Sequence, residues 1–268
     1  MIKSNMSSTQ SSDCRMHNKA VIIQARTGST RLPNKILLKI CDKEILLHLL
    51  DRVLAAKKVG PIIVATTDRP GDDIIVDLVK SYHPRVSFFR GSEEDVLDRY
   101  YQAARQLIGT EPDDWDIIRI TSDCPLIDPL VIDRHITAFD QKQVDYLSSR
   151  IYKRTWPHGM ELEIFTFRAL ETAWHQAREK YEREHVTPYI YTSHATPFKI
   201  SEFTAEQDWS NLRFTIDYQE DYLFIKAIYE KLYPVNPLFG LIDILKLLER
   251  ETHLLQINSN RINPEIRQ

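Results

Sequence analysis

Apolar and polar positions alternate with two different periods through the first half of the chain. Short apolar runs at residues 20–25, 61–66, 86–89 and 116–121 predict buried strands. Between them, apolar residues recur at helical spacing over 45–56, 72–82 and 93–108. A further helix is expected from about Pro129, because proline suits a first helical turn. This alternation indicates right-handed βαβ units and a mostly parallel sheet.

The pattern changes in the second half of the chain. Runs at 144–147, 161–165 and 198–203 predict strands of a mixed or antiparallel region, and 212–216 is expected to be a short buried strand. Helices are predicted over 166–180, 184–191, 218–232 and 238–249, the second with a break or kink at Pro188. We therefore expect an α/β fold in which one core carries a smaller lobe with mixed strands.

Composition narrows the class of protein. The 268 residues are 43% hydrophobic and 27% charged, which fits one large α/β domain spanning residues 19–257. A formal net charge of −3 argues against a nucleic-acid-binding surface, and no apolar run approaches the roughly 20 residues that span a bilayer. Residues 1–18 and 258–268 are expected to be polar tails, the first without the apolar segment of a signal peptide. Three widely spaced cysteines predict neither disulfides nor zinc, so a cytoplasmic location is expected.

A basic loop follows the first predicted strand. Residues 24–35, QARTGSTRLPNK, combine three cations with three small residues: Arg26, Arg31 and Lys35 with Gly28, Ser29 and Thr30. Small residues let backbone N–H groups approach a ligand, and cations neutralise its oxygens, so this composition suits a polyphosphate. The loop is neither a Walker A motif nor a GxGxxG motif. The alternative interpretation is a solvated basic loop.

Two carboxylates end apolar runs. Asp123 follows the run at 116–121 and Asp217 ends the run at 212–216, so both are expected at the carboxyl edge of the sheet. Two such carboxylates can converge on Mg²⁺, which usually takes one or two of them together with phosphate oxygens and water. The alternative is that each side chain caps the helix that follows it.

Two further strand ends carry polar residues. Arg90 and Gly91 are candidates for contacts with a base or ribose, whereas Ser92 and Asp95 resemble the capped start of a helix. Thr66 and Asp68 could line a base pocket or cap a helix.

The second half has its own polar signatures. His158, Glu161, Glu163, Arg183 and His185 could bind a carboxylate-bearing or polyhydroxylated substrate through charge-assisted hydrogen bonds. The alternative is a structural ion-pair network.

Six blocks together resemble the SpsF-like branch of the cytidylyltransferases, which is related to the CMP-sugar-acid synthetases. They are IIQARTGSTRLPNK, FRGSEEDVLDRY, RITSDCPLIDP, HGMELEIF, EREHVTPYIY and RFTIDYQEDY, in order over about residues 19–250. The resemblance implies a Rossmann-like nucleotide-diphospho-sugar transferase fold of GT-A-like type. It also implies that Asp123 and Asp217 bind Mg²⁺ and that Arg26, Ser29, Arg31 and Lys35 face a triphosphate. With the other candidates of the basic loop and of the strand ends, these four make up the predicted nucleotide-binding set, whose remaining members are Ala25, Gly28, Thr66, Asp68, Arg90 and Asp95.

Two departures from the family pattern matter. Asn34 stands where the family has glycine, and asparagine tolerates the left-handed backbone better than most residues. The segment ITSDCP at 120–125 replaces a block that contacts the base in the synthetases, so the base preference is left open between CTP and another nucleoside triphosphate.

The predicted function is Mg²⁺-dependent transfer of CMP from CTP to a sugar or sugar acid, with release of pyrophosphate. Residues 19–148 would form the nucleotide half and 149–257 the sugar-binding and metal half. No nucleic-acid or membrane partner is expected, and a homodimer is left open. The alternatives are a GT-A-like glycosyltransferase and a non-catalytic nucleotide-sugar-binding protein. The first would use a DxD motif after a strand, but the chain's Asp114-Trp115-Asp116 precedes its strand.

Overall fold

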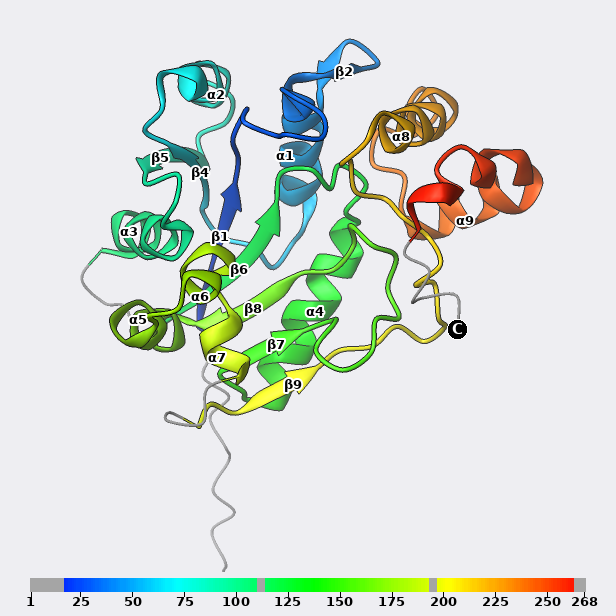
Figure 1. The fold of residues 1–268 in the computed structure, drawn as a ribbon. Coiled ribbons are helices and arrows are strands. Elements are labelled where there is room, and N and C mark those ends of the chain that lie inside the picture. Colours follow the sequence, from blue (N-terminus) through cyan, green and yellow to red (C-terminus); the bar gives the residue numbers. More distant parts are fainter. Residues whose placement is uncertain (1–16, 110–113, 193–196, 263–268) are drawn as a thin grey trace, which may run out of the picture.

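A twisted sheet forms the centre of the protein, for which the computed structural model describes residues 17–109, 114–192 and 197–262. Within these residues the main sheet has seven strands in the order β5-β4-β1-β6-β8-β7-β9 (Figure 1). The first four strands of the chain that enter this sheet are β1 (Asn18–Gln24), β4 (Ile62–Thr67), β5 (Val86–Gly91) and β6 (Trp115–Thr121), and they run parallel. They confirm the predicted parallel core.

The mixed strands continue this sheet and do not form one of their own. β8 (Glu163–Thr166) lies antiparallel between β6 and β7 (Tyr146–Ser148), and β9 (Ile200–Glu202) runs parallel to β7 at the edge. The predicted mostly parallel sheet with a mixed-strand region is therefore confirmed, and that region borders the same carboxyl edge as β6.

Helices cover both faces of the sheet (Figure 1). One face packs on α1 (Ile45–Ala55), α2 (Asp73–Val79) and α4 (Pro129–Lys142). The other packs on α3 (Val96–Ile108), α5 (Phe167–Gln176) and α7 (Pro188–Thr192). A third apolar cluster joins α8 (Gln219–Leu232) and α9 (Leu241–Arg250) with the turn between β2 (Lys39–Ile40) and β3 (Lys43–Glu44). Among the described residues, none of these helices has the length and hydropathy needed to cross a bilayer.

Strand order creates a crevice beside β1. The chain passes from β1 through β4 to β5 on one side and then returns to β6 on the other side of β1. Such a switch in strand order separates the loops that leave neighbouring strands, and α/β proteins bind ligands there. The loops after β1 and β6, which carry the predicted basic residues and Asp123, flank this switch.

Two predicted helices have different bounds. The helix expected from residue 93 begins at Val96, because the Asp95 carboxylate accepts a hydrogen bond from the Asp98 N–H and caps it. The helix expected over 184–191 is divided into α6 (Lys180–His185) and α7. Val186 has a φ of 74°, and Pro188 opens the second helix. The predicted break at Pro188 is thus confirmed.

The strand predicted over 212–216 was wrong. These residues are extended and buried but make only one bridge, between His158 and Arg213. Their remaining backbone groups bond to loops: the Phe214 N–H donates to the His158 carbonyl and the Ile216 N–H donates to the Asp123 carbonyl. This segment therefore connects the loop after β6 to the loop around His158.

The packed chain also extends beyond the expected start of the carboxyl-terminal tail. Asn258 is buried, and its side-chain amide donates to the Arg213 carbonyl and to Asp221. Arg261 forms an ion pair with Glu220. The last six residues, like residues 1–16 of the predicted amino-terminal tail, lie outside the described residues.

Candidate active site

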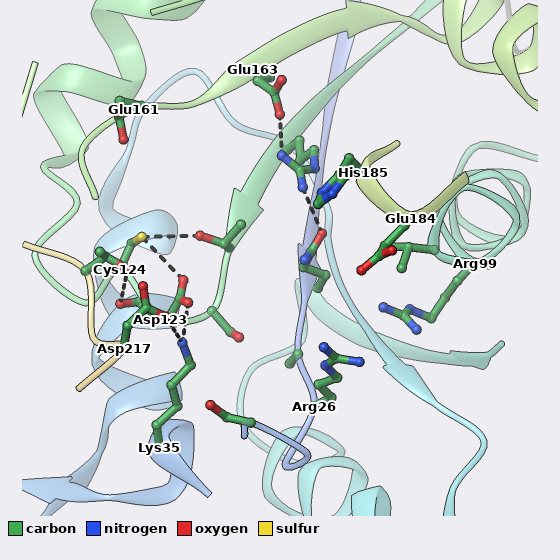
Figure 2. A pocket seen from close by; sticks show the side chains of 18 of the residues that line it. Arg26, Lys35, Arg99, Asp123, Cys124, Glu161, Glu163, Glu184, His185 and Asp217 are labelled. Atoms are coloured by element: carbon green, nitrogen blue, oxygen red, sulfur yellow. Dashed lines mark hydrogen bonds and ion pairs between the residues drawn. The ribbon is translucent and has the colours of Figure 1, made fainter. Parts of the chain in front are cut away.

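A pocket of about 810 Å³ opens at the carboxyl edge of the sheet, around the switch beside β1. The loops after β1 and β6 form one wall, and residues from β7, β8 and α6 form another. In Figure 2, Lys35, Asp123 and Asp217 gather on one side of it, and Arg26 and Arg99 lie across from them. Residues separated by almost two hundred positions therefore share one cavity.

The pocket collects most of the predicted site residues. Those that line it are Ala25, Arg26, Ser29, Arg31, Lys35, Asp123, His158, Glu161, Glu163, His185 and Asp217. Six predicted residues lie outside its lining: Gly28, Thr66, Asp68, Arg90, Asp95 and Arg183.

The ammonium of Lys35 sits in a cage of three oxygens. Its Nζ lies 2.6 Å from Asp123 Oδ2, 2.7 Å from the Ile216 carbonyl oxygen and 2.9 Å from Asp217 Oδ1. Burial alone would lower the pKa of Lys35, but the charges of Asp123 and Asp217 outweigh it and raise the pKa above its ordinary value. Lys35 is therefore charged, and the two predicted metal-site carboxylates converge on one cationic position.

Asp217 is the centre of the charge cluster. Arg31 Nη2 lies 2.7 Å from its Oδ1, and Arg213 Nη2 lies 2.8 Å from its Oδ2. Burial would raise the pKa of Asp217, but the surrounding cations, Lys35 first, hold it below the ordinary value. Asp217 is thus a permanent carboxylate.

The helix-capping alternative fails for both carboxylates. The carboxylate that caps α4 is Asp128, which accepts from the Leu130 N–H. At the start of α8, Asp221 accepts from the N–H groups of Asp217 and Tyr218. Asp123 and Asp217 therefore direct their side chains to cations in the pocket.

The basic loop is held rigidly at its base. Asp72 accepts hydrogen bonds from the Thr27 N–H at 2.7 Å, from the Thr27 hydroxyl and from the Thr67 hydroxyl. Burial opposes its ionisation, but these bonds lower the pKa of Asp72 below its ordinary value. Asn34 adopts the left-handed conformation, with φ 55° and ψ 22°, so the turn expected at this departure from the family pattern is preserved.

Glu163 belongs to a buried network of hydrogen bonds and an ion pair in the pocket wall. Its carboxylate pairs with Arg119 and accepts from Tyr146 and Thr187 at 2.5 and 2.8 Å. Burial opposes ionisation, but Arg119 and the other donors lower the pKa of Glu163. Arg119 reaches on to the side-chain oxygen of Gln24. Glu163 therefore shapes the pocket wall through Arg119 (Figure 2).

A second cluster faces the basic loop from α3. Arg26 Nη1 lies 3.5 Å from Glu93, which also pairs with Arg69. Arg99 is 2% exposed, and its guanidinium donates to the Ser92 carbonyl. Burial, with the nearby charge of Arg26, lowers the pKa of Arg99. This wall adds positive charge opposite Lys35.

Two residues predicted to contact the nucleotide, Arg90 in β5 and Thr66 in β4, lie outside the pocket lining. Arg90 pairs with Asp73 and donates to the Thr67 and Arg69 carbonyls. Thr66 is fully buried within β4. Their contacts with a nucleotide remain predictions.

Arg183 binds the cap of α3. Its Nη2 and Nε lie 2.5 and 3.1 Å from Asp95 Oδ2, and its Nη1 donates to the Trp174 carbonyl. This geometry favours the structural ion-pair alternative, with Asp95 as the partner.

We therefore expect Arg183→Ala to lower the melting temperature and leave the KM for either substrate unchanged. A partly buried ion pair of this kind, in which two guanidinium N–H groups share one carboxylate oxygen and a third donates to a carbonyl, typically contributes about 1–3 kcal/mol. Thermal unfolding and steady-state kinetics measure the two effects, and Arg178→Ala, on an exposed side chain before α6, is the control. A large rise in the sugar KM of a normally stable variant would restore the substrate-binding role.

The acceptor side of the pocket contains His158 and Glu161. Gly159, with φ 101°, brings the loop so close to Phe214 that a Cβ atom would lie 2.7 Å from its backbone. This contact fixes His158, whose Nδ1 lies 2.8 Å from Arg213 Nη1. Glu161 pairs with Arg154, but burial dominates and raises its pKa.

Cys124 is unsuited to nucleophilic chemistry. It is buried beside Asp123, and burial followed by that negative charge raises the pKa of its thiol well above its ordinary value.

The carboxylates fit a magnesium ion that arrives with phosphate. Within the described residues, no group of three or more His, Cys, Asp or Glu side chains could hold a metal ion alone. Asp123 and Asp217 nevertheless converge on one cation, and among the described residues Asp123 Oδ1 accepts a hydrogen bond only from the Cys124 thiol, at 3.5 Å. Two carboxylates completed by phosphate oxygens and water are the usual Mg²⁺ environment. Asp123 and Asp217 would hold it.

Several pocket residues were not predicted. They include Gln24, Arg99, Arg119, Arg150, Lys180 and Glu184. A signal existed for Arg119, because a charge inside the apolar run at 116–121 needs a buried partner. Arg99 lies on the apolar face of its helix and carried the same signal.

Fold and site together define the class as nucleotidyltransferases with a Rossmann-like fold. The chain belongs to the cytidylyltransferase family, whose profile matches residues 20–246. The resemblance seen in the sequence is thereby confirmed.

Several relatives are similar over most of their length. An uncharacterized protein of Methanocaldococcus jannaschii is 40% identical over 241 residues, covering 89% of this chain and 93% of its own. The spore coat polysaccharide biosynthesis protein SpsF of Bacillus subtilis is 35% identical, and the match covers 81% of this chain and 88% of SpsF. A solved cytidylyltransferase from Leptospira borgpetersenii has a TM-score of 0.79 at 34% identity, with 90% and 97% covered.

Proposed function

We propose that this nucleotidyltransferase uses Mg²⁺ and CTP to attach CMP to a sugar acid or modified sugar, releasing pyrophosphate. The observation that carries the proposal is the cluster of Lys35, Asp123 and Asp217 facing the basic loop inside one pocket. It combines cations for a triphosphate with oxygen ligands for the metal that a triphosphate carries.

In this reaction a sugar hydroxyl oxygen attacks the α-phosphorus of CTP, the bond from that phosphorus to the pyrophosphate oxygen breaks, and the hydroxyl proton passes to water or to the departing pyrophosphate. Arg26, Arg31 and Lys35 are placed to neutralise the charge that develops on the phosphate oxygens. Asp123 and Asp217 would hold Mg²⁺, which would supply Lewis-acid stabilisation of the same charge. Positioning and electrostatics then supply most of the catalysis.

Named relatives support the substrate class. A 3-deoxy-manno-octulosonate cytidylyltransferase of Brucella ovis is 35% identical over 124 residues, covering 46% of this chain and 47% of its own. A synthetase for CMP and 2-keto-3-deoxy-manno-octonic acid, solved with CTP, shares the fold with a TM-score of 0.58 at 17% identity, with 80% and 99% covered. The SpsF relative supports a place in polysaccharide precursor synthesis.

The position of the DxD motif does not support the glycosyltransferase alternative. Asp116 lies at the amino-terminal end of β6, where it is buried and pairs with Lys19 at 2.8 Å. It therefore holds two strands together on the edge of the sheet away from the pocket.

A pyrophosphate-release screen tests the proposal. Four nucleoside triphosphates would be offered with Mg²⁺ against a panel of sugar acids, sugar phosphates and neutral sugars. We expect release with CTP and a sugar acid, and none when EDTA replaces Mg²⁺. Turnover that required a nucleotide sugar as the donor would contradict the proposal. Pyrophosphate release with another nucleoside triphosphate, and none with CTP, would also contradict it.

A further inference from the structure

His158 is the histidine on which the acceptor side of the pocket depends, and its ring nitrogens differ in environment. Nδ1 lies 2.8 Å from Nη1 of Arg213. The ring lines the pocket, and its Nε2 has no hydrogen-bond partner among the described residues.

The contact with Arg213 determines where the imidazole proton resides. A guanidinium has only N–H donors and stays charged in proteins. Nδ1 must therefore accept, and a neutral ring that accepts at Nδ1 carries its proton on Nε2. The N–H of His158 consequently points toward the pocket.

The surrounding charges keep the ring neutral. Burial has the largest effect on the pKa of His158, and the charges of Arg154, Arg213 and Arg150 act in the same direction. Together they lower this pKa to about 3, against a smaller opposing effect of Asp217. Glu161, the nearby carboxylate, is paired with Arg154. Burial and these three guanidinium charges outweigh Asp217, so the ring stays neutral.

We propose that His158 is a fixed Nε2–H donor to an oxygen of the acceptor sugar, positioned by Arg213, and that it does not take the proton of the attacking hydroxyl. A base needs a free lone pair facing the substrate, and in His158 that lone pair faces Arg213. The inference rests on the proposed function, because it assigns the oxygen acceptor to the sugar.

Arg213 also ties this donor to the phosphate side of the pocket. Its Nη2 donates to Asp217 at 2.8 Å, and its Nε donates to Asp221 at 2.9 Å. The Asn258 amide fixes the opposite side of the group through Asp221 and the Arg213 carbonyl. One guanidinium thus sets the distance between the sugar donor and Asp217, one of the two carboxylates that hold Lys35.

Nitrogen NMR of the ligand-free full chain tests the tautomer without any substrate. With ¹⁵N-labelled histidine, His158→Gln removes one of nine pairs of ring-nitrogen signals and so assigns the Nδ1 and Nε2 signals of His158. We expect an unprotonated Nδ1 and a protonated Nε2 at every pH from 5 to 8. A protonated Nδ1, or a ring that gains a second proton in this range, would overturn the inference.

Two matched variants test the role. His158→Asn places an oxygen near the Nδ1 position, where it can accept from Arg213, but its short side chain lacks the donor; His158→Gln restores an N–H near the Nε2 position. With CTP and the sugar acid of highest turnover in the screen, Asn should raise the sugar KM about tenfold, as one lost hydrogen bond does, and leave the CTP KM unchanged. Gln should recover most of that loss.

The competing role predicts a different split. A general base would lower kcat about 10²- to 10⁴-fold in both variants and leave the sugar KM unchanged, which would overturn the inference. Melting temperatures show that both variants are folded. If the screen finds no turnover, the proposed function fails, whereas the NMR result still decides the tautomer.

Discussion

Lys35→Ala is expected to lower kcat/KM for CTP by roughly 10²- to 10³-fold, because it removes a preorganised, charge-assisted donor worth about 2–4 kcal/mol in the transition state. Three oxygens hold the ammonium in one position, and the two carboxylates among them keep it charged. Lys35→Met, which keeps the apolar stem, should lose as much activity. Calorimetric titration with CTP and steady-state kinetics measure the two parts of the effect.

Lys39→Ala is the matched control, since Lys39 belongs to the same stretch of chain but is exposed and pairs with Glu44 outside the pocket. The Lys35 variants should lose some stability, because Asp123 and Asp217 would face each other without the ammonium. Asp217 retains Arg31 and Arg213, so the fold should survive. Parental CTP affinity and turnover in a folded Lys35→Ala protein would remove Lys35 from the mechanism.

Asp123→Asn should lower turnover at least about 10²-fold, with partial recovery at high Mg²⁺. Asparagine keeps the shape and one oxygen of the side chain but removes the charge that a hard cation requires. Asp123 is the sharper test of the two carboxylates, because its only ion-pair partner among the described residues is Lys35. Asp217→Asn would also break pairs with Arg31 and Arg213 and so confound metal binding with stability.

Turnover would be measured as a function of Mg²⁺ concentration, and the concentration that gives half-maximal turnover should be higher in Asp123→Asn than in the parent protein. Asp133→Asn is the control, because Asp133 lies on α4 outside the pocket lining and accepts from the exposed Lys57 and Lys58 N–H groups. Unchanged turnover and an unchanged Mg²⁺ dependence in Asp123→Asn would exclude the metal site, whatever the effect on Lys35.

The predictable part of the fold was the part determined by local periodicity. Strands β1, β4, β5 and β6 and helices α1, α4 and α8 follow runs whose burial pattern is visible in the sequence. Residues 212–216 have the same apolar pattern, yet loops satisfy their backbone groups. An apolar run indicates burial, but whether it becomes a strand depends on which partner reaches its backbone.

The candidate site shows the same division. Strand-end position was enough to bring Lys35 and Asp123 together, because parallel strands deliver their loops to one edge. Asp217 joins them at the end of an apolar run that is not a strand. Strand-end position could not reveal the ion pair between Asp95 and Arg183. These two residues are 88 positions apart and come from elements that meet only through tertiary packing. Where a side chain has two candidate partners, only the folded structure shows which of them it contacts.

The cage around Lys35 makes nucleotide entry an exchange. Arg31 and Lys35 already share the Asp217 carboxylate, and Arg26 rests on Glu93, so an incoming phosphate must compete with carboxylates for each cation. A small anion such as inorganic phosphate cannot replace all of these partners at once, whereas a triphosphate carrying its own divalent ion neutralises the displaced carboxylates as it binds. On the proposed function, charge balance alone would make the pocket select the metal–triphosphate pair over either component by itself.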